Sequence, residues 1–126
     1  MLLNVLLVAL GGATGSVLRY LATVVATRWL GPDWPYGTVF VNITGSFLMG
    51  LVVEAIARRF GASNELRLLV ATGILGGYTT FSSFSLDASM LWERGDGLMS
   101  LGYVLLSVGL GICALSAGLA LGRHAF

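Results

Sequence analysis

The stretch from Gly76 to Ser85 reads GGYTTFSSFS and gathers five serine and threonine hydroxyls inside a segment otherwise apolar enough to cross a membrane. Hydroxyl and backbone groups at membrane depth cost free energy unless they are satisfied within the protein or line a wet cavity. Hydroxyls donate hydrogen bonds to anions, and backbone carbonyls bind cations. The stretch therefore predicts a binding partner within the membrane.

The first residues of this stretch predict a break in a helix. Gly76 and Gly77 permit the helix to open, and the β-branched Thr79 and Thr80 do little to hold it closed. A break at membrane depth frees backbone carbonyl oxygens, which are the usual ligands of a hard cation such as sodium. We therefore expect the glycines to open a spanning helix near its middle.

Two phenylalanines follow the expected break and suit contact with an anion. Phe81 and Phe84 are three residues apart, so both rings lie on one helical face. The edge of an aromatic ring is electropositive and meets an anion without the tight hold of a formal charge, although the pair also suits ordinary packing. Ser82, Ser83 and Ser85 add hydroxyl donors beside the rings.

Three further polar residues lie inside apolar segments, where they are costly and usually face a cavity or a partner. Arg19 and Asp87 suit a mutual salt bridge, side chains that reach the membrane surface, or a vestibule. The amide of Asn42 suits a hydrogen bond between helices or a desolvated anion. These residues extend the candidate site beyond the stretch itself.

Helices that cross a membrane must position these side chains. The 126-residue chain is 56% hydrophobic and only 10% charged, with a mean hydropathy of +0.89, far more apolar than a soluble domain. The connections between its apolar segments are too short to hold a soluble domain. We expect an all-α integral membrane protein, a single domain over residues 1–126 with four transmembrane helices, the third broken near its middle. The expected helices cover residues 2–29, 36–58, 66–93 and 98–122.

Other kinds of site find little support. Cys113 is a single thiol in the fourth apolar segment, and His124 has no second ligand near it in sequence, so neither predicts a metal or redox centre. A net charge of +1 argues against a nucleic-acid partner. No catalytic carboxylate pair, Ser/His/Asp arrangement or phosphate-binding loop is present, so we do not expect an enzyme.

The arginines are almost evenly divided between the two ends of the expected helices, and positive charge sets the orientation of membrane proteins. One end carries Arg58, Arg59, Arg67 and Arg123, and the other carries Arg28 and Arg94. Because this bias is small, the chain is expected to insert in both directions. Four short helices also need a second copy to surround a pathway.

Three segments in this order resemble one family: GGATGSVLRY in the first helix, GTVFVNITGSFLMG in the second and GGYTTFSSFS in the third. They resemble the Fluc (CrcB) fluoride channels from about Gly11 to Asp87, and the match thins along the fourth helix. The resemblance implies an antiparallel, dual-topology homodimer that exports fluoride passively through two pores, with a structural sodium ion (Na+) at its centre. It also implies a multi-pass protein of the cell inner (plasma) membrane, surrounded by lipid.

The resemblance gives roles to the central residues of the site. Gly76 and Thr79 resemble the pair whose backbone carbonyls hold the sodium. Phe81 and Phe84 resemble the aromatic box of the fluoride pathway, and Asn42 resembles its amide donor.

The remaining candidates resemble the outer parts of the pathway. The hydroxyl track comprises Ser82, Ser83 and Ser85, to which Tyr103 and Ser107 of the fourth helix are added. Arg19 and Asp87 resemble vestibule residues. Members of the family often carry Thr at the position of Ser83 and Glu at that of Asp87, so this chain has a shorter side chain at both.

Two other functions remain open from the sequence. A small multidrug/proton exchanger also has about four helices and inserts both ways, but it needs a carboxylate in its first helix. This chain has Arg19 there and no acidic residue before Asp33. A non-transporting membrane assembly subunit explains the glycines and the apolarity, but it leaves Asn42 and the hydroxyl run without a role.

Overall fold

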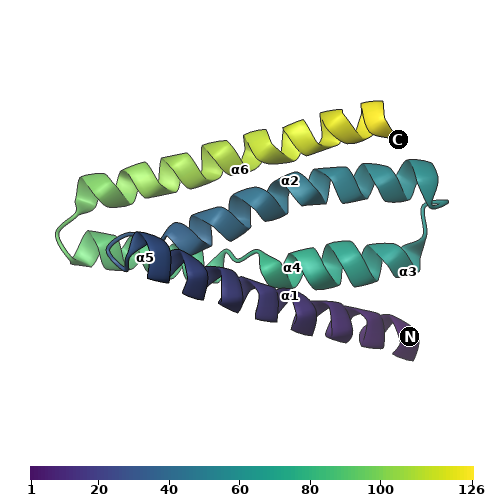
Figure 1. Cartoon of the computed structure of the whole chain (residues 1–126), viewed down its shortest axis with the longest axis horizontal. Helices are drawn as coiled ribbons and strands as arrows, with labels where there is room; N and C mark the ends of the chain where they lie inside the picture. The colour runs from purple at the N-terminus through teal and green to yellow at the C-terminus, as the bar shows by residue number, and fades with distance from the viewer.

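A computed structural model describes residues 1–126 and consists of helices joined by short turns (Figure 1). In chain order the helices are α1 (Leu2–Leu30), α2 (Tyr36–Arg59), α3 (Asn64–Leu66), η1 (Arg67–Leu75), α4 (Gly76–Tyr78), α5 (Ser82–Glu93) and α6 (Gly97–Ala125). Three of them, α1, α2 and α6, are long and apolar enough to cross a membrane. The chain is therefore an all-α, multi-pass membrane protein.

The segment between α2 and α6 is helical in two parts. α3, η1 and α4 follow one another without a gap, residues 79–81 are not helical, and α5 follows. η1 contains π-helical hydrogen bonds, which reach one residue further than those of an α-helix, and the Gly76 N–H donates to the carbonyl oxygen of Ala71. Among the long helices, the largest difference from expectation is at α6, which ends at Ala125.

The interruption lies after the two glycines, so the expectation that the glycines open the helix is wrong. Gly76 has helical angles (φ −62°, ψ −39°), whereas Thr79 is extended (φ −88°, ψ 160°). Extended backbone suits a β-branched residue, so the change of direction falls on a threonine. Gly77 serves a different purpose, because its close contact with α1 leaves no room for a side chain.

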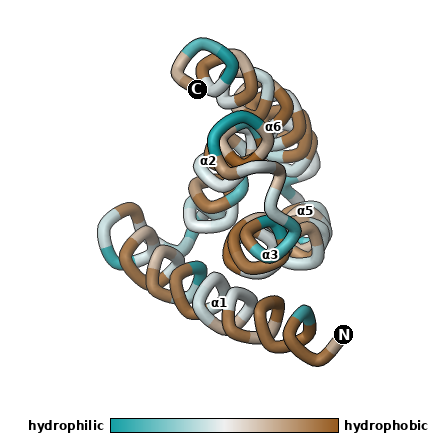
Figure 2. The backbone as a smooth tube through the Cα atoms, turned by 90° about the vertical axis from the view of Figure 1, so that its right-hand side faces the viewer, coloured by the Kyte–Doolittle hydropathy of each residue, from teal (hydrophilic) through white to brown (hydrophobic).

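Two groups of helices pack closely. α2 packs along α6, and α1 packs against η1 and α4. Glycines bring both groups together: a Cβ atom on Gly11 would lie 2.8 Å from the Cα atom of Gly73, and one on Gly50 would lie 2.6 Å from the nitrogen of Leu119. Figure 2 shows α1 at the edge of the bundle, apart from α6. Any polar cavity inside the bundle therefore lies between α1 on one side and α6 on the other.

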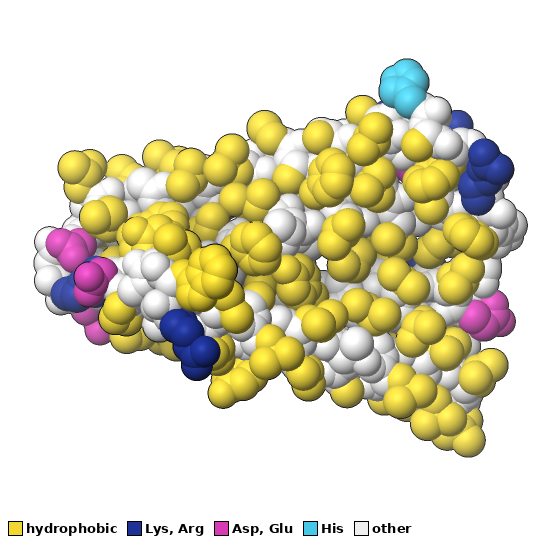
Figure 3. All heavy atoms as spheres, in the orientation of Figure 1, with side chains coloured by type: hydrophobic (Ala, Val, Ile, Leu, Met, Phe, Trp, Pro, Cys, Tyr) yellow, Lys and Arg dark blue, Asp and Glu magenta, His cyan; other side chains and the backbone are white.

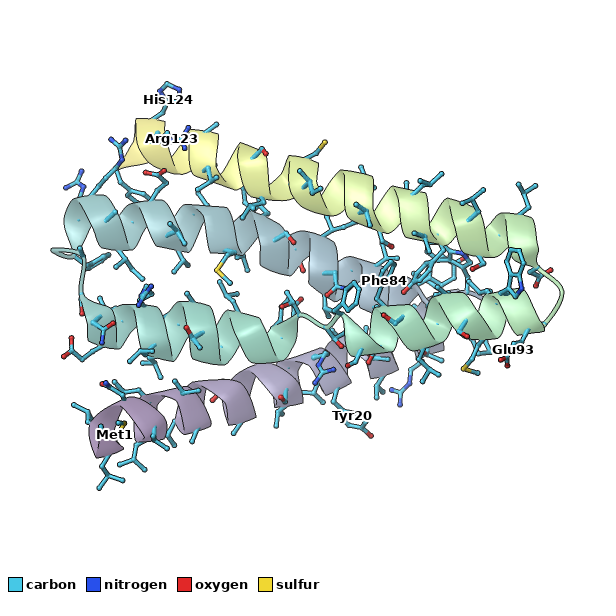
Figure 4. The ribbon with its side chains drawn as sticks, turned by 180° about the vertical axis from the view of Figure 1, so that it is seen from behind. Met1, Tyr20, Phe84, Glu93, Arg123 and His124 are labelled. Carbon is cyan, nitrogen blue, oxygen red and sulfur yellow. The ribbon has the colours of Figure 1, made fainter.

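Most apolar side chains point outwards. Only 18 of 126 residues are buried, and the middle of the face in Figure 3 is mainly hydrophobic, while charged side chains gather near the two ends. Arg123 lies near the end of α6 (Figure 4), and there Glu54 of α2 accepts hydrogen bonds from Arg58 at 2.8 Å and from Arg123 at 3.0 Å. An apolar surface between charged ends suits a chain surrounded by lipid or by a second protein.

Candidate functional site

Asn42 of α2 fixes the interruption between α4 and α5. Its Oδ1 atom accepts a hydrogen bond from the Thr80 N–H at 2.7 Å, and its Nδ2 atom donates to the Thr80 carbonyl oxygen at 2.9 Å. These bonds satisfy backbone groups that have left the helix. The second N–H of the Asn42 amide makes no hydrogen bond within the chain and stays available as a donor.

The two phenylalanines touch each other at the start of α5. Their ring centroids are 5.6 Å apart and their planes are tilted by 50°. Phe84 is buried and points between the helices (Figure 4), where its centroid lies 5.3 Å from that of Tyr103 on α6. Phe81 precedes the first turn of α5 and is 78% exposed. One ring therefore faces the interior and the other faces outwards.

A cavity of about 270 Å³, here named the inner cavity, opens beside the interruption. Its lining comes from α2, α5, α6 and the interruption itself: Asn42, Ser46, Thr79, Thr80, Phe81, Phe84, Ser107 and Val108. The Ser107 hydroxyl is buried and has no hydrogen-bond partner. A buried hydroxyl without a partner is costly, so Ser107 marks a place that a polar ligand would satisfy.

A second cavity of about 390 Å³, the outer cavity, lies between α1, α2 and α5. It is lined by Ser16, Arg19, Tyr20, Thr23, Thr38, Val41, Thr80, Ser83 and Asp87. Arg19 and Asp87 line it together but form no ion pair within 4.0 Å. The structure therefore excludes the mutual salt bridge and places a guanidinium and a carboxylate beside one polar cavity.

Asp87 is held in its position by two hydroxyls. Its Oδ2 atom accepts hydrogen bonds from Thr38 Oγ1 at 2.7 Å and from Tyr103 Oη at 3.1 Å. Tyr103 is 1% exposed, and its ring meets that of Trp34 edge to face at 5.4 Å. The Tyr103 hydroxyl is thus engaged by Asp87, and the residue does not line the inner cavity that contains Ser107.

The serines of the expected hydroxyl track differ in what they bond. Ser85 donates to the Phe81 carbonyl oxygen at 2.9 Å, so its proton is used within the chain. Ser82 lies 3.3 Å from the hydroxyl of Thr80. Ser83 lines the outer cavity, and its hydroxyl makes no hydrogen bond in the chain. Available hydroxyl donors are therefore found in both cavities: Ser83 in the outer and Ser107 in the inner.

Four carbonyl oxygens at the interruption, those of residues 76–79, have lost their helical donors, and two of them belong to the expected sodium pair, Gly76 and Thr79. In an unbroken helix the Thr80 N–H would donate to the Gly76 carbonyl, but here it donates to Asn42. The Thr79 carbonyl also lacks its helical donor, because the Ser83 N–H, which would donate to it in an unbroken helix, donates to Thr80 Oγ1 instead. Gly76 is exposed, and a Cβ atom there would meet only the Ala71 carbonyl oxygen, at 3.6 Å. The structure thus places four acceptors without donors, including those of Gly76 and Thr79, where the chain changes direction.

Eight residues that line these cavities were not expected as site residues from the sequence: Thr38, Ser46, Thr80, Ser16, Tyr20, Thr23, Val41 and Val108. Thr38, Asn42 and Ser46 recur every four residues and so share one face of α2. A row of polar residues on one face of an otherwise apolar helix is the sequence signal that identifies Thr38 and Ser46. No comparable signal marks Thr80, because its position depends on where the interruption falls.

Apolar outer surfaces with polar cavities between helices are the architecture of a membrane transport protein. The sequence matches the profile of the family described as "CrcB-like protein, Camphor Resistance (CrcB)" over residues 6–119. The chain belongs to the CrcB family, and the expected membership is confirmed.

Curated relatives match this chain over almost its whole length. A protein of Agrobacterium fabrum is 58% identical over 125 residues, which are 99% of this chain and 100% of the relative. Proteins of Chelativorans sp. and Allorhizobium ampelinum are 56% and 55% identical, over 95% and 98% of this chain and 96% and 98% of the relatives. All three carry the name "Fluoride-specific ion channel FluC".

Proposed function

We propose that this chain forms a fluoride-specific ion channel that exports fluoride passively across the cell inner membrane. Relatives that match nearly the whole chain are named fluoride-specific ion channels. The structural observation that supports it best is the inner cavity, where the buried Ser107 hydroxyl lacks a partner. The free N–H of Asn42 and the Phe84 ring line the same cavity, so uncharged groups suited to a small anion converge there.

Uncharged donors explain how such a pathway combines selectivity with flow. Fluoride is small and strongly hydrated, so a selective pathway must replace its water with several donors, yet hold the ion weakly enough to release it. Amide and hydroxyl groups supply the hydrogen bonds, and aromatic edges add positive potential without a formal charge. Arg19 lines the larger outer cavity, where its guanidinium attracts anions and offsets the negative charge of Asp87.

We further propose that α3 to α5 cross the membrane as a fourth, interrupted span, and that two antiparallel chains form a dimer with two pathways. Exposed backbone acceptors at membrane depth require a partner, and Gly76 is exposed. The Phe81 ring is exposed beside the same interruption. A second, inverted copy would cover both, and the small arginine bias allows chains to insert in both orientations.

A structural sodium ion fits the carbonyl oxygens of Gly76 and Thr79. Both oxygens lack donors within the chain, and oxygen atoms are the ligands that hard cations prefer. Each residue would bind through its backbone, so the side chains matter only through the local conformation. The ion would supply positive charge where two chains meet and would stay there as part of the dimer.

Ion flux from liposomes tests the proposed function directly. Purified protein is reconstituted into liposomes loaded with either potassium fluoride or potassium chloride, and efflux is started with a potassium ionophore. Rapid fluoride efflux with chloride retained supports the proposal. Equal release of both anions, or no release of fluoride from liposomes shown to contain folded protein, contradicts it.

Paired orientation variants test the antiparallel assembly. Two or three lysines added at one end of the helices should lock one orientation, and the same number at the other end should lock the opposite one. Each locked form alone should be inactive, and co-expression of the two should restore fluoride efflux. Full activity from either form alone would indicate a parallel dimer or a different architecture.

A further inference from the structure

The outer and inner cavities share a single lining residue, Thr80. On its other side the outer cavity continues into a third cavity of about 280 Å³ near the turn between α1 and α2. Those two cavities have three lining residues in common, Thr23, Thr38 and Asp87. The cavities thus form a row from the turn between α1 and α2 to the interruption, and Thr80 is the only residue that lines both of the last two.

Thr80 is held firmly at this junction. Both of its backbone polar groups are bonded to the Asn42 amide, at 2.7 and 2.9 Å. Its Oγ1 atom accepts a hydrogen bond from the Ser83 N–H at 3.1 Å and lies 3.3 Å from Ser82 Oγ. With backbone and hydroxyl oxygen both fixed, the side chain stays between the two cavities.

The Thr80 hydroxyl proton differs from those of the other bonded threonines. The hydroxyls of Thr14, Thr23, Thr44 and Thr79 each donate to the carbonyl oxygen four residues earlier, and that of Thr38 donates to the Asp87 carboxylate. Such a bond uses the proton within the chain. Thr80 makes no bond of this kind, since its hydroxyl meets only Ser82 Oγ and the Ser83 N–H. Its proton can therefore turn from Ser82 to a ligand in either cavity.

We propose that Thr80 is the partition between the outer and inner cavities, and that its hydroxyl donates to fluoride as the anion crosses between them. The inference rests on the proposed channel function. The Thr80 hydroxyl supplies a donor where one residue lines both cavities. Its methyl group narrows the connection between them. Fluoride coming from the Ser83 side would pass Thr80 before it meets Ser107.

Three substitutions separate the hydroxyl from the shape of the side chain. Thr80→Val keeps the shape and removes the donor, Thr80→Ala removes donor and methyl, and Thr80→Ser keeps the donor and removes the methyl. Thr14→Val is the matched control, because its hydroxyl is bonded to the Leu10 carbonyl oxygen on α1 at 2.8 Å and lines neither cavity. Fluoride efflux from liposomes and elution in size-exclusion chromatography are measured for all four and for the unsubstituted chain.

We expect Thr80→Val and Thr80→Ala to lower fluoride efflux at least about tenfold, the effect of losing a hydrogen bond to a charged group. Thr80→Ser should stay within about threefold of the unsubstituted chain and still retain chloride. If Thr80→Val fails to fold, the Thr80→Ala and Thr80→Ser pair decides. Unchanged efflux after loss of the hydroxyl, or equal loss in Thr80→Ser, overturns the inference. No efflux from the unsubstituted chain and Thr14→Val would instead refute the proposed function.

Discussion

Gly77 of α4 and Gly12 of α1 are in direct backbone contact, and a Cβ atom on Gly77 would lie 2.6 Å from the Gly12 carbonyl oxygen. This contact holds α1, which carries Arg19, against the helical turn that precedes the interruption. The outer cavity lies between the same elements, since Arg19 and Thr80 both line it. Its shape therefore depends on a glycine that lines neither cavity.

Gly77→Ala should destabilise the protein by about 1–3 kcal/mol, because the added methyl group must push α1 away from α4. A lower midpoint of thermal unfolding in detergent measures this effect. Gly109→Ala on α6 is the matched control, because a Cβ atom there meets nothing within 4 Å. Equal midpoints for the two variants would show that the backbones do not approach as closely as described.

Asn42→Leu should lower both stability and fluoride efflux. The substitution removes both partners of the Thr80 backbone, and each unsatisfied group costs about 1–3 kcal/mol. Asn42→Asp should recover part of the stability, because a carboxylate still accepts from the Thr80 N–H. It should not recover efflux, because a negative charge repels fluoride. Wild-type stability of Asn42→Leu would contradict the role of Asn42 in fixing the interruption.

The spanning helices and the residue types of the site could be predicted from the sequence because both follow from local composition. Long apolar runs identify α1, α2 and α6, although Arg19 lies within the first, and a hydroxyl run in apolar surroundings identifies the stretch around the interruption. The point of interruption was misplaced because it depends on tertiary contacts. Gly77 is required by the close approach of α1, and the Asn42 amide satisfies the N–H and carbonyl groups of Thr80 beside the extended Thr79.

Long-range hydrogen bonds also decide which hydroxyls remain available. Tyr103 and Ser107 are four residues apart on α6 and were predicted to belong to one pathway, but Asp87 engages only Tyr103. Ser82, Ser83 and Ser85 are similar in sequence, yet the Ser82 hydroxyl lies beside that of Thr80, the Ser85 hydroxyl donates to the Phe81 carbonyl oxygen, and the Ser83 hydroxyl makes no hydrogen bond in the chain. Spacing along a helix identifies a face, whereas the availability of a donor depends on the hydrogen bonds that the folded chain makes, some of them to residues distant in sequence.

Phe81→Ile should lower fluoride efflux about tenfold, because it removes a ring-edge contact worth about 1.4 kcal/mol while keeping apolar bulk. Phe81 is 78% exposed in the single chain, so the fold of the chain should be unaffected. Phe40→Ile is the matched control, with a ring that is 53% exposed on α2 and lines neither cavity. Unchanged efflux from folded Phe81→Ile would remove Phe81 from the pathway.

Sodium should stabilise the dimer without crossing the membrane. A ligand that binds only the assembled state stabilises it by about 1.4 kcal/mol for each tenfold rise in concentration above the dissociation constant. The free energy of dimer dissociation in detergent should therefore rise with sodium chloride and not with the chloride of a bulky organic cation at equal ionic strength. Radioactive sodium should stay inside liposomes that release fluoride.

Gly76→Val tests whether that ion lies between two chains. Within one chain the new side chain finds open space, because a Cβ atom at Gly76 meets only the Ala71 carbonyl oxygen at 3.6 Å. Helix content should therefore be retained, while the sodium dependence of dimer dissociation should be lost, since bulk beside the carbonyl keeps the second chain away. Thr79→Ser leaves the carbonyl in place and should keep the sodium dependence. A dimer of Gly76→Val that responds to sodium as the unsubstituted protein does would place the ion elsewhere.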